Sequence, residues 1–126
     1  MKLSTLLLFI SALSSCSPNY EFGDKDLTTK LQVTKWADLK ENPSRYLNDT
    51  ILISGTYHSG FEDSSIKRNS DMIWVSSFNP LQIDQELEEK IINRNIKIVG
   101  LFNPNDKGHL GQYLGSIEEI YYLKTE

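Results

Sequence analysis

Two segments of the chain share one pattern, and this pattern constrains the fold more than any other feature of the sequence. Residues 51–57 and residues 96–102 both read Ile-x-Ile-x-Gly-x-aromatic. Alternate residues of a β-strand face the same side, so each segment would place both isoleucines, the glycine and the aromatic ring on one face. A glycine inside an apolar strand marks a bend, a bulge or a close approach of another backbone. Two strands that each bend at a core-facing glycine favour a small barrel, because a sheet must curl in order to close.

The remaining elements indicate a mainly β fold. Residues 72–76 and 117–123 are expected to be strands, and residues 31–34 alternate as a short strand would. Residues 83–92 predict a helix, since Ile83, Leu87 and Ile91 recur at helical spacing and the acidic residues form a solvated face. Residues 36–40 predict a helical turn that ends before a proline. We therefore expect a five-stranded barrel with one short helix between strands three and four, plus an N-terminal helical turn. An open α+β sandwich is the alternative.

The start of the chain has the order of a secretory signal. Lys2 gives a positive start, an apolar run extends from Leu3 to Leu13, and small residues lead into Cys16, the only cysteine. The run is about half the roughly 20 apolar residues that a membrane-spanning helix requires. Leu13-Ser14-Ser15-Cys16 resembles the lipobox of bacterial lipoproteins. In that family a diacylglycerol is attached to the cysteine sulfur, and a peptidase cuts just before it.

This resemblance implies a protein of the cell envelope that is held at a membrane through Cys16. Ser17 stands where some family members carry an aspartate that retains them in the inner membrane, which favours the outer membrane if the host is Gram-negative. The chain then divides into a signal peptide (1–15), the lipidated cysteine with a flexible tether (16–30), and one barrel domain (31–126). Residues 17–30 are polar and rich in turn formers, without a sustained period.

The charge of the mature domain argues against nucleic acid as a partner. Removing Lys2 with the signal leaves 12 of the 13 basic residues against 17 acidic ones, a net charge of −5. Lys67-Arg68 is the longest basic run. An acidic domain is repelled by a phosphate backbone, whose neutralisation dominates nucleic-acid affinity.

The predicted element order is that of the OB-fold, in which a helix separates the third and fourth strands. Residues 31–124 resemble small OB-fold-like envelope domains of bacteria, and also envelope proteins that pair a Gly-Phe-Glu-x-Ser loop with a later Gly-His-x-Gly loop. The resemblance implies that residues 58–65 and 108–115 flank the face that this fold uses for ligands. The candidate ligand-binding residues in and near these loops are His58, Glu62, Ser65, Trp74, His109 and Tyr113.

Several interpretations of these residues remain open. His58, Glu62 and His109 could hold a divalent metal such as zinc, although no His-x-His or His-x-x-x-His spacing orients a pair. His109 and Glu62 could instead be a base and its orienting partner beside Ser59 or Ser65, but no Gly-x-Ser-x-Gly motif is present. A polar pocket for a small molecule or glycan could use aromatic rings as stacking surfaces, namely Trp74, Tyr57 and Tyr113. The structural interpretation is that His109 and Glu62 only brace the loops.

The sequence therefore predicts a lipid-anchored envelope module that binds a small molecule, a glycan or an envelope protein, and that needs no cofactor. It contains no phosphate-binding loop, dinucleotide fingerprint or His-Glu-x-x-His motif. The alternative is a small metal-dependent hydrolase that uses His58, Glu62 and His109, and a third hypothesis is a structural subunit of an envelope assembly.

Overall fold

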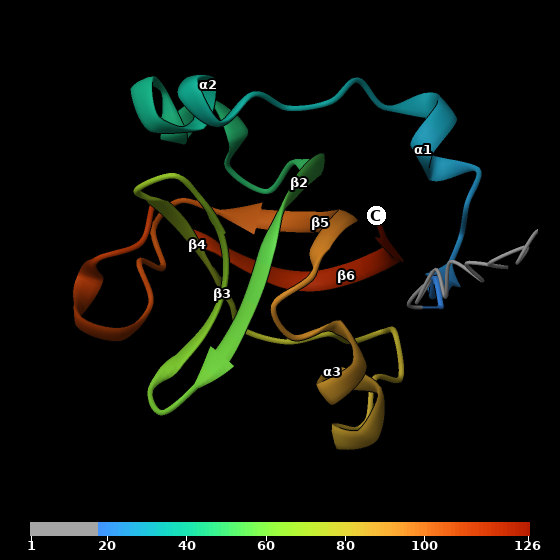
Figure 1. Cartoon of the computed structure of the whole chain (residues 1–126). Coiled ribbons are helices and arrows are strands. Elements are labelled where there is room, and N and C mark those ends of the chain that lie inside the picture. Colours follow the sequence, from blue (N-terminus) through green and yellow to red (C-terminus); the bar gives the residue numbers. More distant parts are fainter. Residues whose placement is uncertain (1–17) are drawn as a thin grey trace, which may run out of the picture.

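The computed structural model describes residues 18–126, so the predicted signal peptide and Cys16 lie outside the described residues. The fold is mainly β, as predicted, and Figure 1 shows its strands curling around one interior with short helices at the periphery. In chain order the elements are β1 (Glu21–Gly23), α1 (Leu27–Lys30), α2 (Trp36–Glu41), the 3-10 helix η1 (Pro43–Tyr46), β2 (Thr50–Gly60), β3 (Asp63–Arg68), β4 (Asp71–Val75), α3 (Gln85–Ile91), β5 (Asn95–Asn103), the 3-10 helix η2 (His109–Gly111) and β6 (Ser116–Thr125).

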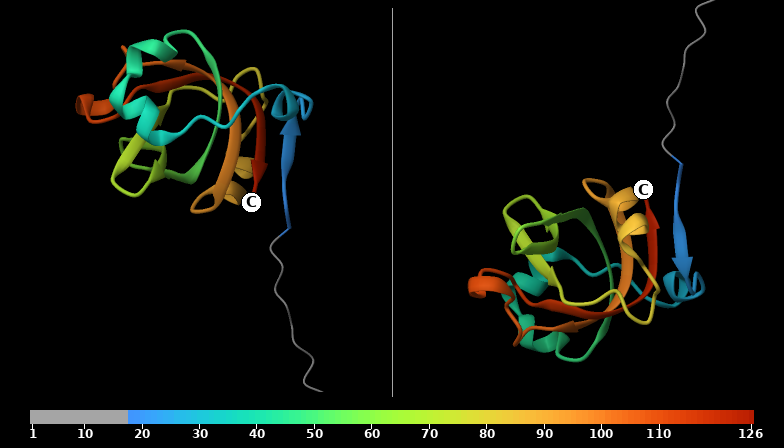
Figure 2. Two further views of the ribbon diagram at one scale, coloured as in Figure 1. Left: turned by 90° about the horizontal axis from the view of Figure 1, so that it is seen from above. Right: turned by 90° about the horizontal axis from the view of Figure 1, so that it is seen from below.

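One six-stranded sheet contains all the strands, in the order β1-β6-β4-β3-β2-β5. The pairings are antiparallel, except that β4 and β6 run parallel at Trp74↔Ser116 and Val75↔Ile117. β5 also pairs with β6, so the strand at one end of the order returns to a strand near the other end. This contact makes the sheet curl, and it places the β2–β3 turn and the β5–β6 connection close to each other (Figure 2).

The six strands differ from the predicted five in three places: no strand forms at residues 31–34, β3 forms partly within the loop expected at residues 58–65, and β1 adds to the edge of β6. β1 lies within residues 18–30, which we expected to be a tether without regular structure. The backbone N–H of Thr125 donates to the carbonyl of Tyr20 at 2.9 Å, and that of Asp24 donates to Tyr121 at 3.1 Å. A three-residue strand is too short to show a period in the sequence, and it forms here because β6 offers an unpaired edge.

The two matching segments form β2 and β5, and their apolar faces make the main core. The predicted face is confirmed, because the core cluster includes Ile51, Ile53 and Tyr57 of β2 together with Ile96, Ile98 and Phe102 of β5. The register of β5 against β6 shifts at Gly100, where an added Cβ would lie 2.6 Å from the carbonyl oxygen of Glu119. An added Cβ at Gly55 would lie 2.5 Å from a methyl group of Ile66. Both glycines therefore permit a close approach that a side chain would block.

The predicted helix is confirmed as α3, one or two residues shorter at each end. The side chain of Asp84 caps its first turn by accepting from the backbone N–H of Leu87 at 2.9 Å. Ile91 is fully buried in the core. The acidic face is not wholly solvated, since Glu88 accepts a hydrogen bond from the hydroxyl of Tyr57 at 2.7 Å.

The segment before β2 packs on the outside of the sheet. Leu27 and Leu31 cover a second cluster formed by three outward-facing side chains, Leu52, Val99 and Tyr122. The expected strand at residues 31–34 is wrong, since only Val33 forms an isolated bridge, to Leu52. This bridge is parallel, and the backbone N–H of Thr34 donates to the carbonyl of Leu52 at 2.8 Å. The predicted helical turn is confirmed as α2, and no helix within residues 18–126 is long and apolar enough to cross a membrane.

Candidate functional site

Two loops from distant parts of the sequence meet beside the outer face of β3. The first is the turn between β2 and β3, and the second is the connection between β5 and β6, which contains η2. Nε2 of His109 lies 3.0 Å from Oε2 of Glu62, so the loops are in direct contact. Their side chains are 39% and 52% exposed, which makes this a surface contact. We define the two-loop platform as residues 60–63 together with residues 108–113.

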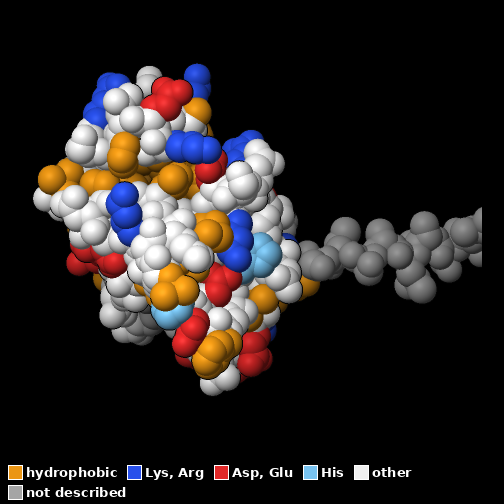
Figure 3. Space-filling model, turned by 90° about the vertical axis from the view of Figure 1, so that its left-hand side faces the viewer, with side chains coloured by type: hydrophobic (Ala, Val, Ile, Leu, Met, Phe, Trp, Pro, Cys, Tyr) orange, Lys and Arg blue, Asp and Glu red, His pale blue; other side chains and the backbone are white. Residues whose placement is uncertain are grey.

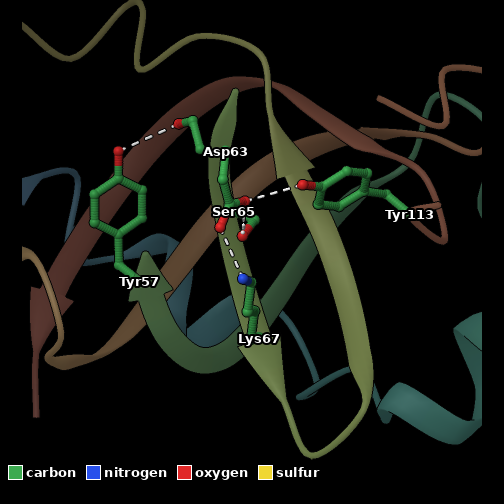
Figure 4. A network of polar contacts seen from close by, with 6 residues as sticks. Tyr57, Asp63, Ser65, Lys67 and Tyr113 are labelled. Carbon is green, nitrogen blue, oxygen red and sulfur yellow. Dashed lines mark hydrogen bonds and ion pairs between the residues drawn. The ribbon is translucent and has the colours of Figure 1, made fainter. Parts of the chain in front are cut away.

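A polar network centred on Asp63 joins the second loop to β3 (Figure 4). Oδ1 of Asp63 accepts hydrogen bonds from the hydroxyls of Ser65 at 2.7 Å and Tyr113 at 2.9 Å. Oδ2 of the same carboxylate accepts from Nζ of Lys67 at 2.7 Å. One carboxylate therefore holds three donors, and one of them comes from the far loop.

Sequence reasoning missed Lys67 as a member of the site, and it did not predict that Asp63 lies at the centre of the network. Asp63, Ser65 and Lys67 alternate along β3, so their side chains share one face of the strand. This Asp-x-Ser-x-Lys spacing was the available signal. It indicates which residues share a face, but it does not reveal that Tyr113 reaches the same carboxylate.

The network fixes the protonation states of its two acids. Burial alone would raise the pKa of Asp63, but the hydrogen bonds from Lys67, Ser65 and Tyr113 and the charge of Lys67 together lower it. Burial, followed by the hydrogen bond to Asp63 and its charge, raises the pKa of Tyr113 to about 12. At neutral pH Asp63 is thus an ionised acceptor and Tyr113 a protonated donor, which suits a permanent contact between loop and strand.

Two aromatic rings support the second loop from beneath. Trp74 and Tyr113 pack edge to face, with ring centroids 5.1 Å apart and an interplanar angle of 72°. Gly108 has a φ of 66°, and an added Cβ there would lie 2.7 Å from the Tyr113 ring and 2.9 Å from Trp74. The loop backbone can therefore lie against both rings only because residue 108 is glycine.

Several of the predicted site residues are occupied by internal contacts. Tyr57 is fully buried, its ring packs edge to face on Phe78, and it offers no stacking surface. Burial, offset in part by a hydrogen bond from Ser64 and reinforced by Glu88, raises its pKa to about 12. Ser65 has no exposed surface, and its hydroxyl donates to Asp63. Ser65 is thus not placed to act as a nucleophile.

The three residues predicted as metal candidates are not brought together. His58 lies opposite Ser65 on the outer face of β2, whereas Glu62 and His109 meet at the loops. Within residues 18–126, no group of three or more histidine, cysteine or acidic residues is placed to hold a metal ion. Both histidines open onto one face of the molecule, and other side chains lie between them (Figure 3).

The platform displays two large apolar side chains to solvent. Phe61 is 93% exposed and Leu110 is 75% exposed. Their loops also contain two residues other than glycine with a positive φ, Glu62 at 55° and Leu110 at 59°. Such conformations cost free energy in residues other than glycine, and the surrounding contacts must hold them. This exposure could not be predicted from the sequence, because apolar residues are usually assigned to a core.

Three pockets of the described residues are lined by other parts of the fold, and none of the three includes a platform residue. Comparisons with protein-family models, with curated proteins and with solved structures find no match to this chain.

Proposed function

We propose that this protein is a lipid-anchored binding module of the cell envelope, built on an OB-like barrel. The barrel is supported by the order of the strand pairings, which form a closed circuit. β2 pairs with β3, β3 with β4, β4 with β6, β6 with β5, and β5 again with β2. The position of α3 between β4 and β5 supports it further, since the OB-fold has a helix between its third and fourth strands.

The contact surface is the two-loop platform, and its partner is another envelope protein. The observation that carries this proposal is the exposure of Phe61 and Leu110 on two loops that the Tyr113–Asp63 hydrogen bond and the Glu62–His109 pair connect. Exposed aromatic and aliphatic side chains on a preorganised surface are typical anchors of protein interfaces. No platform residue lines any of the three pockets described above, and the platform's two apolar side chains project into solvent, which favours a protein partner over a small molecule.

The arrangement of the domain agrees with this role. β1, which follows the predicted anchor in the chain, lies on one side of the domain, and the β5–β6 connection lies on the opposite side (Figures 1 and 2). A module anchored ahead of β1 presents its platform away from the bilayer that holds it.

Acylation is tested by comparing the full-length chain with its Cys16→Ala variant in a bacterial host supplied with a clickable fatty acid. We expect label and membrane sedimentation for the unaltered chain, and neither for the variant, with the mass of the mature N-terminus confirming the modified residue. Equal labelling of both chains would contradict the assignment of the anchor to Cys16.

The platform is tested by placing a photo-crosslinking amino acid at Phe61 or at Leu110 in cells. Glu89, which is exposed on α3, is the control position. We expect the same discrete crosslinked partner from both platform positions and not from the control. Crosslinks that are equal at all three positions, or absent at both loops, would refute the platform as the contact surface.

A further inference from the structure

The opposite end of β3 borders a second surface, which the proposed function does not use. Two adjoining pockets of about 590 Å³ and about 460 Å³ share Val33, Arg68 and Asn69 in their walls. The larger pocket also includes the middle of β2 and the start of β5, and the smaller one includes the first turn of α2. We call the two together the basic groove.

The charge of the basic groove is opposite to that of the molecule. Two acidic residues, Asp71 and Glu126, line it. Five basic residues also line it, so its formal charge is +3 in a chain of net charge −4. The basic residues are Lys35, Lys40, Lys67, Arg68 and Lys97.

The cations differ in whether they are already paired. Lys67 is paired with Asp63, Lys40 lies 3.4 Å from Asp71, and Lys97 lies 3.5 Å from Glu126. Within the described part of the chain, Arg68 and Lys35 make no ion pair. Arg68 is exposed and lines both pockets, so an unpaired guanidinium occupies the junction of the groove.

One wall of the groove already holds a carboxylate. Oε2 of Glu126 accepts from the side-chain amide of Asn95 at 2.6 Å, and Oε1 accepts from the hydroxyl of Ser54 at 3.4 Å. Nζ of Lys97 lies 3.5 Å from the same Oε1. Three donors from β2 and β5 are therefore arranged around an anionic group, which shows the geometry that a ligand carboxylate or phosphate would find there.

We propose that the basic groove binds a small oligoanion, a molecule that carries two or more phosphate or carboxylate groups on a polar framework. Arg68 and Lys35 supply free charge. Glu126 is a built-in competitor that must move aside for one anionic group to reach Lys97 and Asn95. The larger pocket has the volume of a small-molecule site, and the polar groups of Ser54, Thr56 and Asn69 add hydrogen-bonding partners.

The test is isothermal titration calorimetry of the full-length protein in detergent at low ionic strength, with tripolyphosphate and, separately, with citrate. We expect saturable binding of at least one of them, and affinity that falls as salt is added, because exposed charges are screened. The two probes distinguish phosphate from carboxylate recognition.

Two substitutions in the groove should have opposite effects. We expect Arg68→Gln to raise the Kd about fivefold, because it removes one exposed charge contact. Glu126→Gln should lower the Kd about twofold or more, since it removes the competing charge. Lys107→Gln, an exposed cation of the β5–β6 connection outside both pockets, is the control of equal charge change.

These results distinguish a specific anion-binding site from non-specific electrostatic attraction. Equal weakening by Arg68→Gln and Lys107→Gln would overturn the proposal, because it would mean that only net charge matters. Absence of saturable binding for both probes would overturn it as well. An unchanged melting temperature of each variant confirms that the fold is intact, and neither readout depends on the platform or on acylation.

Discussion

Replacing Asp63 should destabilise the fold by more than any single exposed charge could. In Asp63→Ala, the buried hydroxyl of Ser65 and the hydroxyl of Tyr113 both lose their acceptor, and Lys67 loses its ion-pair partner. A hydrogen bond to a charged group contributes about 1.5 kcal/mol or more, and the partly exposed Lys67 pair adds less than about 1 kcal/mol. We expect a loss of about 3 kcal/mol in the free energy of unfolding.

Asp63→Asn separates the charge from the acceptor. The amide retains one oxygen that can accept from Ser65 or Tyr113, so we expect a loss of about 1–2 kcal/mol. Glu89→Gln is the matched control and should change stability by less than about 0.5 kcal/mol. The assay is urea unfolding at neutral pH, with an unchanged m-value expected for all variants. A loss for Asp63→Ala no larger than that of the control would refute the role of Asp63 as the hub.

The unaltered chain and its Asp63→Asn variant also allow a test of how stability depends on pH. The pKa of Asp63 is lower in the folded state than its ordinary value of 3.8, so its stabilising contribution is present above that value and is lost as the pH falls through the folded pKa. The stability difference between the unaltered chain and Asp63→Asn should therefore shrink in acid below this value. A difference that stays constant through the acid range would contradict the electrostatic account.

Three further outcomes are expected. His109→Ala should cost less than about 1 kcal/mol in urea unfolding, because it removes only a half-exposed pair; a larger loss would mean that the imidazole has a further role in the fold. Folding raises the pKa of Tyr57, Tyr113 and Tyr122 to about 12. The contribution of these groups to the free energy of unfolding is therefore complete below pH 10.0 and falls as the pH rises towards 12. Phenolate absorbance should show that these tyrosines titrate late, and Tyr113→Phe should remove part of this late titration. Gly108→Ala should cost about 2 kcal/mol and alter the near-ultraviolet circular dichroism of the aromatic pair, since its Cβ has no space; an unchanged spectrum would count against the packing described.

The core could be predicted because its signal is local. The alternation in β2 and β5 assigns each side chain to a face, and the apolar spacing in α3 does the same for a helix. Gly100 could be interpreted in advance, since a core-facing glycine in a strand has few physical explanations. Short-range periodicity therefore predicted the mainly β fold and its interior.

The candidate site could be predicted only in part, because its contacts join residues far apart in the chain. The hydrogen bond between Tyr113 and Asp63 spans 50 positions, and it depends on strand register and loop conformation that no local pattern encodes. The pairing of His109 with Glu62 is of the same kind. The exposure of Phe61 could not be predicted for another reason. Composition does not show whether an apolar side chain faces the core or the solvent.

The hydrogen bond between Arg94 and Pro18 would limit how far the domain can move from an acylated Cys16. Nη1 of Arg94 donates to the carbonyl oxygen of Pro18 at 2.7 Å, so the chain is already fastened to the fold two positions after Cys16. A fully extended chain spans at most about 3.6 Å per residue, so Cys16 and Pro18 can be at most about 7 Å apart. With acyl chains on Cys16, this short link would hold the domain at a nearly constant distance from the bilayer. A compact domain of this size has a radius of gyration of about 13 Å, so the platform would stand roughly 30 Å from the bilayer. Its partner would have to meet it at that height, and the search between them would be confined to a thin layer parallel to the membrane.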